Sequence, residues 1–197
     1  MKTQVNKMND QTYPVGDVQM PYDHWNTQDF IVIRLKKIGR ITLDPCSNKK
    51  SIVKARHNIM PPQDGLMIPW KGFTYVNPPF SSIRAWVHYG LEQRFGPRYL
   101  KHLVFLLPFS PETHYFKKIW HTTPMNRGRP GRPSTVVGFP QSRFKFIDSK
   151  NKKRDNKSPM ISSTLVYHGL EPKKFIHAFD DILTIVTNWK TQNHRIH

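Results

Sequence analysis

The sequence has little cysteine and few long apolar runs. Cys46 is the only cysteine among 197 residues, which excludes an intramolecular disulfide and a cysteine-based zinc cluster. No apolar stretch is long enough to cross a bilayer, and the N-terminus has no signal-peptide core. The histidines are scattered without the spacing of metal ligands. We therefore expect a cytoplasmic protein outside the membrane that holds no metal.

Acidic residues are also scarce. Asp and Glu number 13 against 31 Lys and Arg, which gives a formal net charge of +18. Such an excess predicts a polyanionic partner, with nucleic acid as the first candidate and an anionic membrane surface as the second. The hydrophobic content of 37% is enough for a packed core. The length predicts one domain over residues 21–197, preceded by a polar, mobile arm over residues 1–20.

The hydrophobic patterns alternate between strand-like and helix-like segments. They predict strands over residues 41–43, 73–76 and 103–107, and helices over residues 27–37, 82–95, 112–120 and 173–189. Residues 143–147 and 162–167 are expected to pair as strands, whereas residues 121–139 are expected to form a loop. This order predicts an α/β fold with a mostly parallel sheet and a C-terminal antiparallel hairpin. Asp44 and Asn77 both follow predicted strands, at the edge where such sheets bind ligands.

The most informative motif is Asn77-Pro78-Pro79-Phe80, directly after the strand at 73–76. Its asparagine supplies an amide oxygen, its prolines fix φ and remove two N–H donors, and its phenylalanine supplies an aromatic face. This combination suits a site that holds a planar amino group through hydrogen-bond acceptors and stacks the attached ring. A strand-to-loop turn bounded by prolines is the plainer interpretation.

Further short segments accompany this motif in a consistent order along residues 22–167. They are Asp23-His24-Trp25-Asn26-Thr27, Leu43-Asp44-Pro45-Cys46-Ser47, Asp64-Gly65-Leu66 with Trp70, Ser81 with Trp86-Val87, Phe105-Leu106-Leu107-Pro108, Arg143-Phe144-Lys145-Phe146, and Ser158-Pro159 before Leu165-Val166. With the Asn-Pro-Pro-Phe motif, this ordered set resembles the phage Dam-type DNA N6-adenine methyltransferases, which use S-adenosylmethionine.

The resemblance implies a Rossmann-like methyltransferase fold and methyl transfer to adenine N6 in double-stranded DNA at a short site. Asn77 and the Pro78 carbonyl would accept hydrogen bonds from the target amino group, with Pro79 shaping the turn and Phe80 stacking on the base. Because that nitrogen is unreachable inside a duplex, the base would have to be flipped out.

The resemblance also implies cofactor contacts. For S-adenosylmethionine the candidate residues are Trp25, Thr27, Asp44, Pro45, Cys46 and Asp64. Asp44 could accept hydrogen bonds from ribose hydroxyls or pair with the ammonium group, whereas a simple Asp-Pro turn is its alternative. Trp25 could equally be a core residue and Asp64 a turn residue. No Gly-x-Gly loop follows the first strand, and Asp44-Pro45-Cys46-Ser47 occupies that region.

Two basic segments are candidates for DNA contact. Arg127, Arg129 and Arg132 lie in a segment that resembles an AT-hook, which binds a narrow minor groove. Lys152, Lys153 and Arg154 are expected at a hairpin tip that touches phosphates, and Arg143 lies nearby. Solvated loops are the alternative for both segments.

Other functions remain open at this point. The same tetrapeptide motif is compatible with RNA adenine, cytosine N4 or protein glutamine methylation, although the charge favours a nucleic acid. A catalytically silent DNA-binding module with this fold is the alternative from a different class. The recognition site does not follow from the sequence, and a monomer is the simplest expectation.

Overall fold

The computed structural model describes residues 25–95, 100–121, 134–144, 147–148 and 162–187. The N-terminal arm expected at residues 1–20 lies outside these ranges. Within them the elements follow in this order: β1 (Trp25–Asn26), α1 (Asp29–Ile38), β2 (Leu43–Asp44), β3 (His57–Asn58), the 3-10 helix η1 (Gly65–Met67), β4 (Gly72–Val76), the 3-10 helix η2 (Phe80–Ser82), α2 (Ile83–Phe95), β5 (Leu100–Pro108), α3 (His114–His121), β6 (Ser134–Pro140), β7 (Ile147–Asp148), β8 (Ser163–Gly169), α4 (Pro172–Phe179) and β9 (Leu183–Val186).

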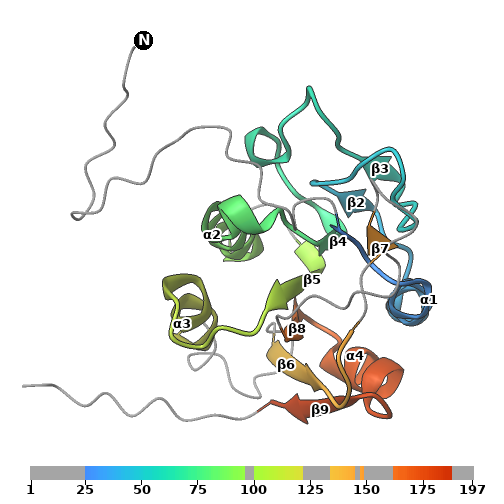
Figure 1. Cartoon of the computed structure of the whole chain (residues 1–197), viewed down its shortest axis with the longest axis vertical. Helices are drawn as coiled ribbons and strands as arrows, with labels where there is room; N and C mark the ends of the chain where they lie inside the picture. Colours follow the sequence, from blue (N-terminus) through green and yellow to red (C-terminus); the bar gives the residue numbers. More distant parts are fainter. Residues whose placement is uncertain (1–24, 96–99, 122–133, 145–146, 149–161, 188–197) are drawn as a thin grey trace, which may run out of the picture.

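Seven of these strands form a mixed sheet in the order β3-β2-β4-β5-β8-β6-β9 (Figure 1). Strands β3, β2, β4 and β5 run parallel, whereas β8, β6 and β9 are each antiparallel to their neighbours. We call the edge where β2, β4 and β5 end, at Asp44, Val76 and Pro108, the carboxyl edge. The opposite edge is where β5 begins at Leu100 and β8 ends at Gly169.

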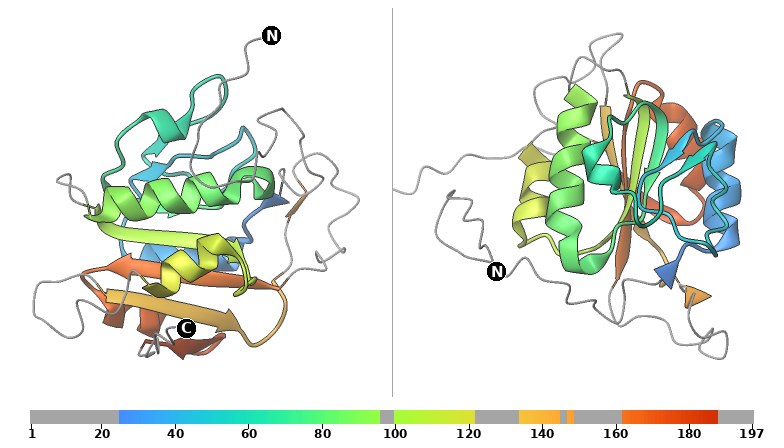
Figure 2. Two further views of the ribbon diagram at one scale, coloured as in Figure 1. Left: turned by 90° about the vertical axis from the view of Figure 1, so that its left-hand side faces the viewer. Right: turned by 90° about the horizontal axis from the view of Figure 1, so that it is seen from above.

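Helices cover both faces of this sheet. Figure 2 shows α1 and α4 on one face and α2 and α3 on the other. Side chains alternate between the two faces along each strand, so Tyr75 packs in the cluster with α1 and α4, and Val76 packs in the cluster with α2 and α3. In β5 every residue except Lys101 is buried, as expected of a central strand covered on both faces.

Helix α1 illustrates why the sequence pattern succeeds for the first half of the chain. Asp29 lies in its first turn and Lys36 and Lys37 in its last, where their charges complement the helix dipole. Its core-facing stripe consists of Ile31, Val32, Leu35 and Ile38. Helix α1 and β5 lie within a few residues of their predicted ranges.

The prediction of a mostly parallel sheet was wrong, because three of the seven strands run antiparallel to their neighbours. The predicted hairpin of residues 143–147 with 162–167 was also wrong. Strand β8 pairs instead with β5 and β6, and β7 pairs with β1 in a separate two-stranded sheet. All residues of β8 are buried, and a strand that is buried on both faces belongs inside a sheet rather than at its edge.

Two predictions near the C-terminal half need correction. The loop expected at residues 121–139 contains most of strand β6, whose run from Thr135 to Gly138 is buried between β8 and β9. The helix expected at residues 173–189 ends at Phe179, and β9 follows it. Asp180 and Asp181 explain this stop, because negative charges at a helix C-terminus oppose the dipole. Asp181 instead forms a two-pronged ion pair with Arg34 of α1, at 2.6 and 2.7 Å.

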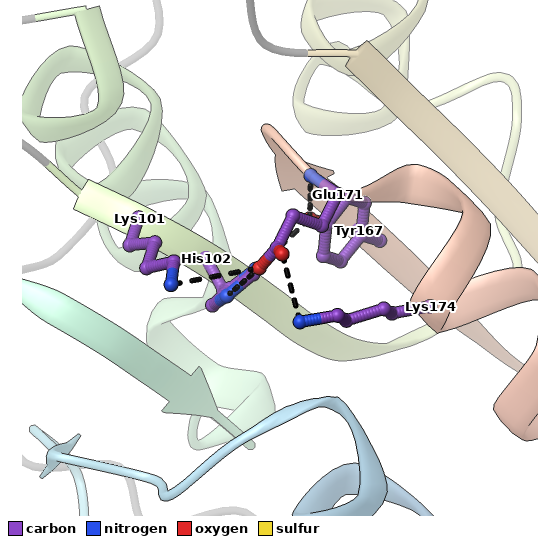
Figure 3. Close-up of polar contacts among 5 residues, drawn as sticks. All are labelled: Lys101, His102, Tyr167, Glu171 and Lys174. Atoms are coloured by element: carbon purple, nitrogen blue, oxygen red, sulfur yellow. Dashed lines mark hydrogen bonds and ion pairs between the residues drawn. The ribbon is translucent and has the colours of Figure 1, made fainter.

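A cluster of polar side chains joins β5 to α4 at the opposite edge (Figure 3). The Tyr167 hydroxyl lies 2.9 Å from Nδ1 of the buried His102 and accepts a hydrogen bond from the Glu171 N–H. His102 Nε2 lies 3.2 Å from the Glu171 carboxylate, which also pairs with Lys174 at 2.7 Å and Lys101 at 3.6 Å. The hydrogen bond from Lys174 is the main cause that lowers the pKa of Glu171.

Candidate active site

The segment Asn77-Pro78-Pro79-Phe80, which the sequence predicts to be catalytic, lies at the carboxyl end of β4, and we call it the catalytic corner. The alternation of side chains places Asn77 on the same face as Tyr75, toward β1. Its Nδ2 donates a hydrogen bond to the Trp25 carbonyl oxygen at 2.9 Å. A carbonyl can only accept, so this contact fixes which end of the amide carries the oxygen. Oδ1 receives no hydrogen bond from the described residues and is available as an acceptor.

The backbone of the catalytic corner is held by the neighbouring strand end. Cys46, just after β2, donates a hydrogen bond from Sγ to the Asn77 carbonyl oxygen at 3.3 Å. Burial, and then the charge of Asp44, raises the pKa of the Cys46 thiol. The thiol therefore keeps the proton that this hydrogen bond requires. The only cysteine of the chain thus links the ends of β2 and β4 rather than acting as a thiolate nucleophile.

The prolines turn the chain from β4 into α2. Pro79 is extended, with φ −60° and ψ 132°, and its carbonyl accepts a hydrogen bond from the Ser82 N–H at 3.2 Å. Trp86 then donates from its indole N–H to the Ser82 hydroxyl at 3.2 Å. Pro78 is buried, whereas Phe80 is half-buried at the start of η2. The turn therefore presents the carbonyl and ring groups of the motif from a rigid support.

A cleft of about 550 Å³ opens beside the catalytic corner. This volume lies within the range of small-molecule sites, about 300–1,000 Å³. The residues that line it come from the ends of β2 and β4, from the segment around β1, from the loops after β2 and before η1, and from the start of α2. All six predicted cofactor residues line it, namely Trp25, Thr27, Asp44, Pro45, Cys46 and Asp64. Two residues of the catalytic corner, Asn77 and Pro79, line it as well. Pro78 and Phe80 adjoin the cleft in the chain without being among its lining residues.

Asp44 gives the cleft a buried acidic group. Its side chain is 4% exposed, and burial raises its pKa to about 6. Hydrogen bonds from Ser47, the Cys46 N–H and Ser51 oppose this rise. The carboxylate therefore carries a charge above about pH 6 in a place with little water. Such a group has a strong electrostatic reason to bind a cation or hydroxyl donors.

The segment around β1 closes another side of the cleft. Asn26 donates to the Lys50 carbonyl at 3.1 Å and accepts from Asn48 at 2.6 Å, which fixes β1 against the loop after β2. The Thr27 hydroxyl lies 2.7 Å from the Tyr75 hydroxyl, and burial raises the pKa of that tyrosine. Together with the Trp25–Asn77 bond, these contacts join the N-terminal segment to both strand ends.

The wall formed by Asp64 and Gly65 depends on close packing. Asp64 accepts a hydrogen bond from the Leu66 N–H at 2.9 Å and so caps η1. A Cβ atom on Gly65 would overlap the Pro45 carbonyl, which is why this position requires glycine. Trp70 donates its indole N–H to the Gly65 carbonyl at 2.8 Å. The structure thus supports the turn interpretation of Asp64 and also places this residue at the cleft.

Several lining residues were missed by sequence reasoning. They are mainly small polar groups and wall residues, namely Asn26, Ser47, Asn48, Ser51, Val53, Ile59, Gln63, Gly65, Tyr75 and Trp86. Asn26, Ser47, Gly65 and Trp86 lie in the segments that carry the family resemblance, and this was the signal that could have found them; at Gly65 the Asp-Gly pair also indicates a turn. The others depend on which segments the fold brings to one edge.

Among the predicted DNA-binding residues, only Arg143 is described, and it is exposed after β6. Arg127, Arg129, Arg132, Lys152, Lys153 and Arg154 lie outside the described residues. The ends of the two segments are nevertheless placed. Strand β6 begins with Ser134 opposite Gly169, so the first segment rejoins the fold at the opposite edge. Strand β8 begins with Ser163 opposite Pro108, so the second segment rejoins the fold at the carboxyl edge.

Two other kinds of feature are absent from the part of the chain that the structure describes. There, no group of His, Cys, Asp or Glu side chains gathers as a set of metal ligands. No helix in those ranges is long and apolar enough to cross a bilayer.

Comparison with known families agrees with the geometry of this edge. A family model described as DNA N-6-adenine-methyltransferase (Dam) matches residues 18–187, which is most of the chain. The chain therefore belongs to the Dam family of DNA adenine-N6 methyltransferases. Curated protein sequences gave no match to the chain.

Proposed function

We propose that the protein transfers a methyl group from S-adenosylmethionine to the exocyclic N6 of adenine in double-stranded DNA, with the target base flipped out of the helix. The observation that carries this proposal is the Asn77 side chain. Its Nδ2 is bound to the Trp25 carbonyl, and Oδ1, which accepts no hydrogen bond from the described part of the chain, lies beside a cleft with a buried carboxylate. Family membership supplies the class of reaction.

The cleft fits the cofactor by size and by charge. Asp44 would pair with the ammonium group or accept from ribose hydroxyls, and Trp25, Thr27, Pro45, Cys46 and Asp64 would surround the ligand. When bound, S-adenosylmethionine supplies an electrophilic methyl group on a sulfonium centre. The raised pKa of Asp44 supports this fit, because a cation in the cleft would relieve the cost of burying the carboxylate charge.

The catalytic corner would act on the adenine amino group. Asn77 Oδ1 and the Pro78 carbonyl would accept its two hydrogens, which favours a tetrahedral nitrogen and localises its lone pair. The Trp25 contact holds the Asn77 side chain, and the Cys46 contact holds the Asn77 backbone carbonyl next to Pro78, before substrate arrives. Groups fixed in this way need no reorganisation during the reaction, which is the main source of electrostatic catalysis. Phe80 would stack on the base ring.

The charge of the chain favours DNA as the partner. A net charge of +18 attracts the phosphate backbone and would offset part of the unstacking cost of about a few kcal/mol. The Rossmann-like fold, the single domain over residues 21–197 and the intracellular location belong to the same proposal. A short recognition site is expected for such an enzyme.

The test is direct identification of the product. The purified protein is incubated with unmethylated double-stranded plasmid DNA and S-adenosylmethionine labelled in the methyl group, and the DNA is then digested to nucleosides. Label in N6-methyl-2′-deoxyadenosine supports the proposal. Label in N4-methylcytosine, label only when RNA replaces DNA, or tight DNA binding without cofactor binding would each contradict it.

A further inference from the structure

An exposed aromatic ring stands at the carboxyl edge outside the cleft. Phe109 directly follows β5, and its side chain is 38% exposed. It is absent from the residues that line the cofactor cleft. Neither cofactor binding nor the grip on the amino group requires it. Single exposed apolar rings are common on protein surfaces, and what distinguishes this one is its place at the carboxyl edge beside the candidate site.

One side of the Phe109 ring packs against other aromatic rings. It packs edge-on against Phe116 of α3, with ring centroids 5.5 Å apart, and against Phe139 of β6 at 4.9 Å. The Phe109 N–H donates to the Ser162 carbonyl at 2.7 Å, and Tyr115 donates to the Pro108 carbonyl at 3.1 Å. Both the backbone and one side of the ring are therefore fixed. A ring prepared in this way loses little conformational freedom when its other side meets a ligand.

The sheet register places Phe109 beyond the level of the catalytic corner along the strand direction. Val76 at the end of β4 pairs with Phe105, so Asn77 lies level with Leu106. Strand β5 continues through Pro108 while still paired with β8, and Phe109 follows. Three further residues at about 3.3 Å each place Phe109 roughly 10 Å beyond Asn77 along the strand direction. The ring therefore stands at the rim of the carboxyl edge, where a duplex would approach, rather than at the depth of the target amino group.

The local sequence indicates stacking rather than attraction to phosphate. Residues 108–113 contain no lysine or arginine, and their one charged residue is the exposed Glu112. Such a segment offers a phosphate no positive charge. An aromatic or apolar side chain can enter a base stack and replace the contacts that a missing base leaves behind.

We propose that Phe109 inserts into duplex DNA next to the extruded adenine and occupies the space that the base vacates. This inference depends on the proposed function, because it assumes a flipped base. Phe80 and Phe109 then have different partners, namely the extruded base for Phe80 and the remaining stack for Phe109. By this inference Phe109 lowers the cost of extrusion and takes no part in methyl transfer itself.

The test compares two duplexes that differ only opposite the target. The methylated site is first mapped on plasmid DNA, and oligonucleotide duplexes are then made with thymine or an abasic residue opposite the target adenine. Phe109→Ala should reduce the single-turnover methylation rate about tenfold or more on the paired duplex, as removal of one stacking ring predicts. The abasic duplex, whose adenine is already unpaired, should lose less than about threefold. Phe109→Leu retains an apolar wedge and should fall between Phe109→Ala and wild type on the paired duplex.

Phe30→Ala is the matched control. Phe30 is also 38% exposed and packs edge-on against Phe144 at 5.7 Å, but it lies on α1, on the other face of the sheet. The ratio of rates on the two duplexes should not change in this variant. Equal losses on both duplexes with Phe109→Ala, or the same ratio change with Phe30→Ala, would overturn the role of Phe109 while leaving the proposed function intact. No methylation of either duplex by the wild-type protein would overturn both.

Discussion

The two halves of the sheet place their connections differently. In the parallel half, β2, β4 and β5 all end at the carboxyl edge, so the segments after them meet there. In the antiparallel half, β8 and β6 run in opposite directions, and their flanking segments are distributed between both edges. The cleft therefore gathers residues from 25 to 86, whereas the described residues of the C-terminal half contribute none of its lining. The candidate site thus lies in the half where strand direction repeats.

The same comparison separates the two basic segments. Residues 122–133 join α3 to β6, and β6 begins at the opposite edge. Residues 149–161 join β7 to β8, and β8 begins at the carboxyl edge. Moreover, β7 pairs with β1, whose Trp25 carbonyl holds Asn77. The sheet topology thus relates the second segment to the active site more closely than the first.

The largest effect is expected at the catalytic corner. Asn77→Ala removes the acceptor and should reduce the methylation rate at least about 100-fold, because loss of one preorganised hydrogen-bonding group has costs of this size. Asn77→Asp keeps the oxygen but loses the donor to the Trp25 carbonyl, so we expect a loss there too. DNA affinity should stay near the wild-type value in both variants. Single-turnover rates and a DNA titration provide the measurements.

Asn58→Ala is the control for this corner. Asn58 ends the neighbouring parallel strand β3, and its amide donates to the Ala55 carbonyl, but it does not line the cleft. Wild-type methylation by Asn77→Ala, or an equal loss in Asn58→Ala, would break the assignment of the chemistry to the end of β4.

A second large effect is expected at Asp44. Because its pKa in the folded protein, about 6, is above its ordinary value of 3.8, folding favours the protonated carboxyl. In the cofactor-free protein the contribution of Asp44 to stability should then be largest below about pH 4 and fall by up to about 3 kcal/mol as the pH rises above 6. Asp44→Asn should remove this loss and also remove the stabilisation that S-adenosylmethionine provides at pH 8.

Thermal melts across pH, with and without cofactor, measure both consequences of Asp44→Asn. In the wild-type protein, cofactor affinity should fall as the pH drops through 6, because protonation removes the charge that holds the ligand. Glu112→Gln, at an exposed acid outside the cleft, should change neither quantity. Unchanged cofactor affinity in Asp44→Asn would exclude a direct role for the carboxylate.

A smaller and graded effect is expected from the basic segments. Replacing Lys152, Lys153 and Arg154 with alanine should weaken DNA binding, lower its salt dependence by up to about 0.9 for each phosphate that the variant no longer neutralises, and reduce methylation at low DNA concentration. Replacing Arg127, Arg129 and Arg132 should affect salt-dependent affinity more than the methylation rate of bound DNA. Binding at several salt concentrations and rates with saturating DNA distinguish the two variants. If the two sets of replacements have the same effects, the attachment of the two segments at different edges of the sheet does not affect their roles in DNA binding and methylation.

The sequence predicted the parallel half better than the antiparallel half for a physical reason. Leu103 to Leu107 and the stripe of α1 carry strong periodic signals, and the Asn-Pro-Pro-Phe motif marks a strand end by its own chemistry. Strand β6 follows a Pro-, Gly- and Arg-rich run, whose composition predicts a loop rather than a strand. Strand β9 continues the apolar pattern of α4, so the pattern predicts one longer helix. Pairing partners such as Trp25 with Asn77 depend on tertiary contacts between distant segments, which local periodicity does not encode.

The smallest effect is expected at the opposite edge, where the polar cluster around Glu171 has a structural role. Glu171→Gln should lower the free energy of unfolding by about 1 kcal/mol, since its interactions with His102, Lys101 and Lys174 no longer involve a charged carboxylate, and it should leave methylation of saturating DNA unchanged. Because the pKa of Glu171 is lowered in the folded protein, its contribution is present at neutral pH and is lost on acidification.

Glu92→Gln, which breaks an exposed pair with His88, provides the control for a simple surface ion pair. Urea denaturation at pH 7 and pH 4 measures the difference, and a loss of methylation rate in Glu171→Gln would show that the opposite edge also takes part in catalysis.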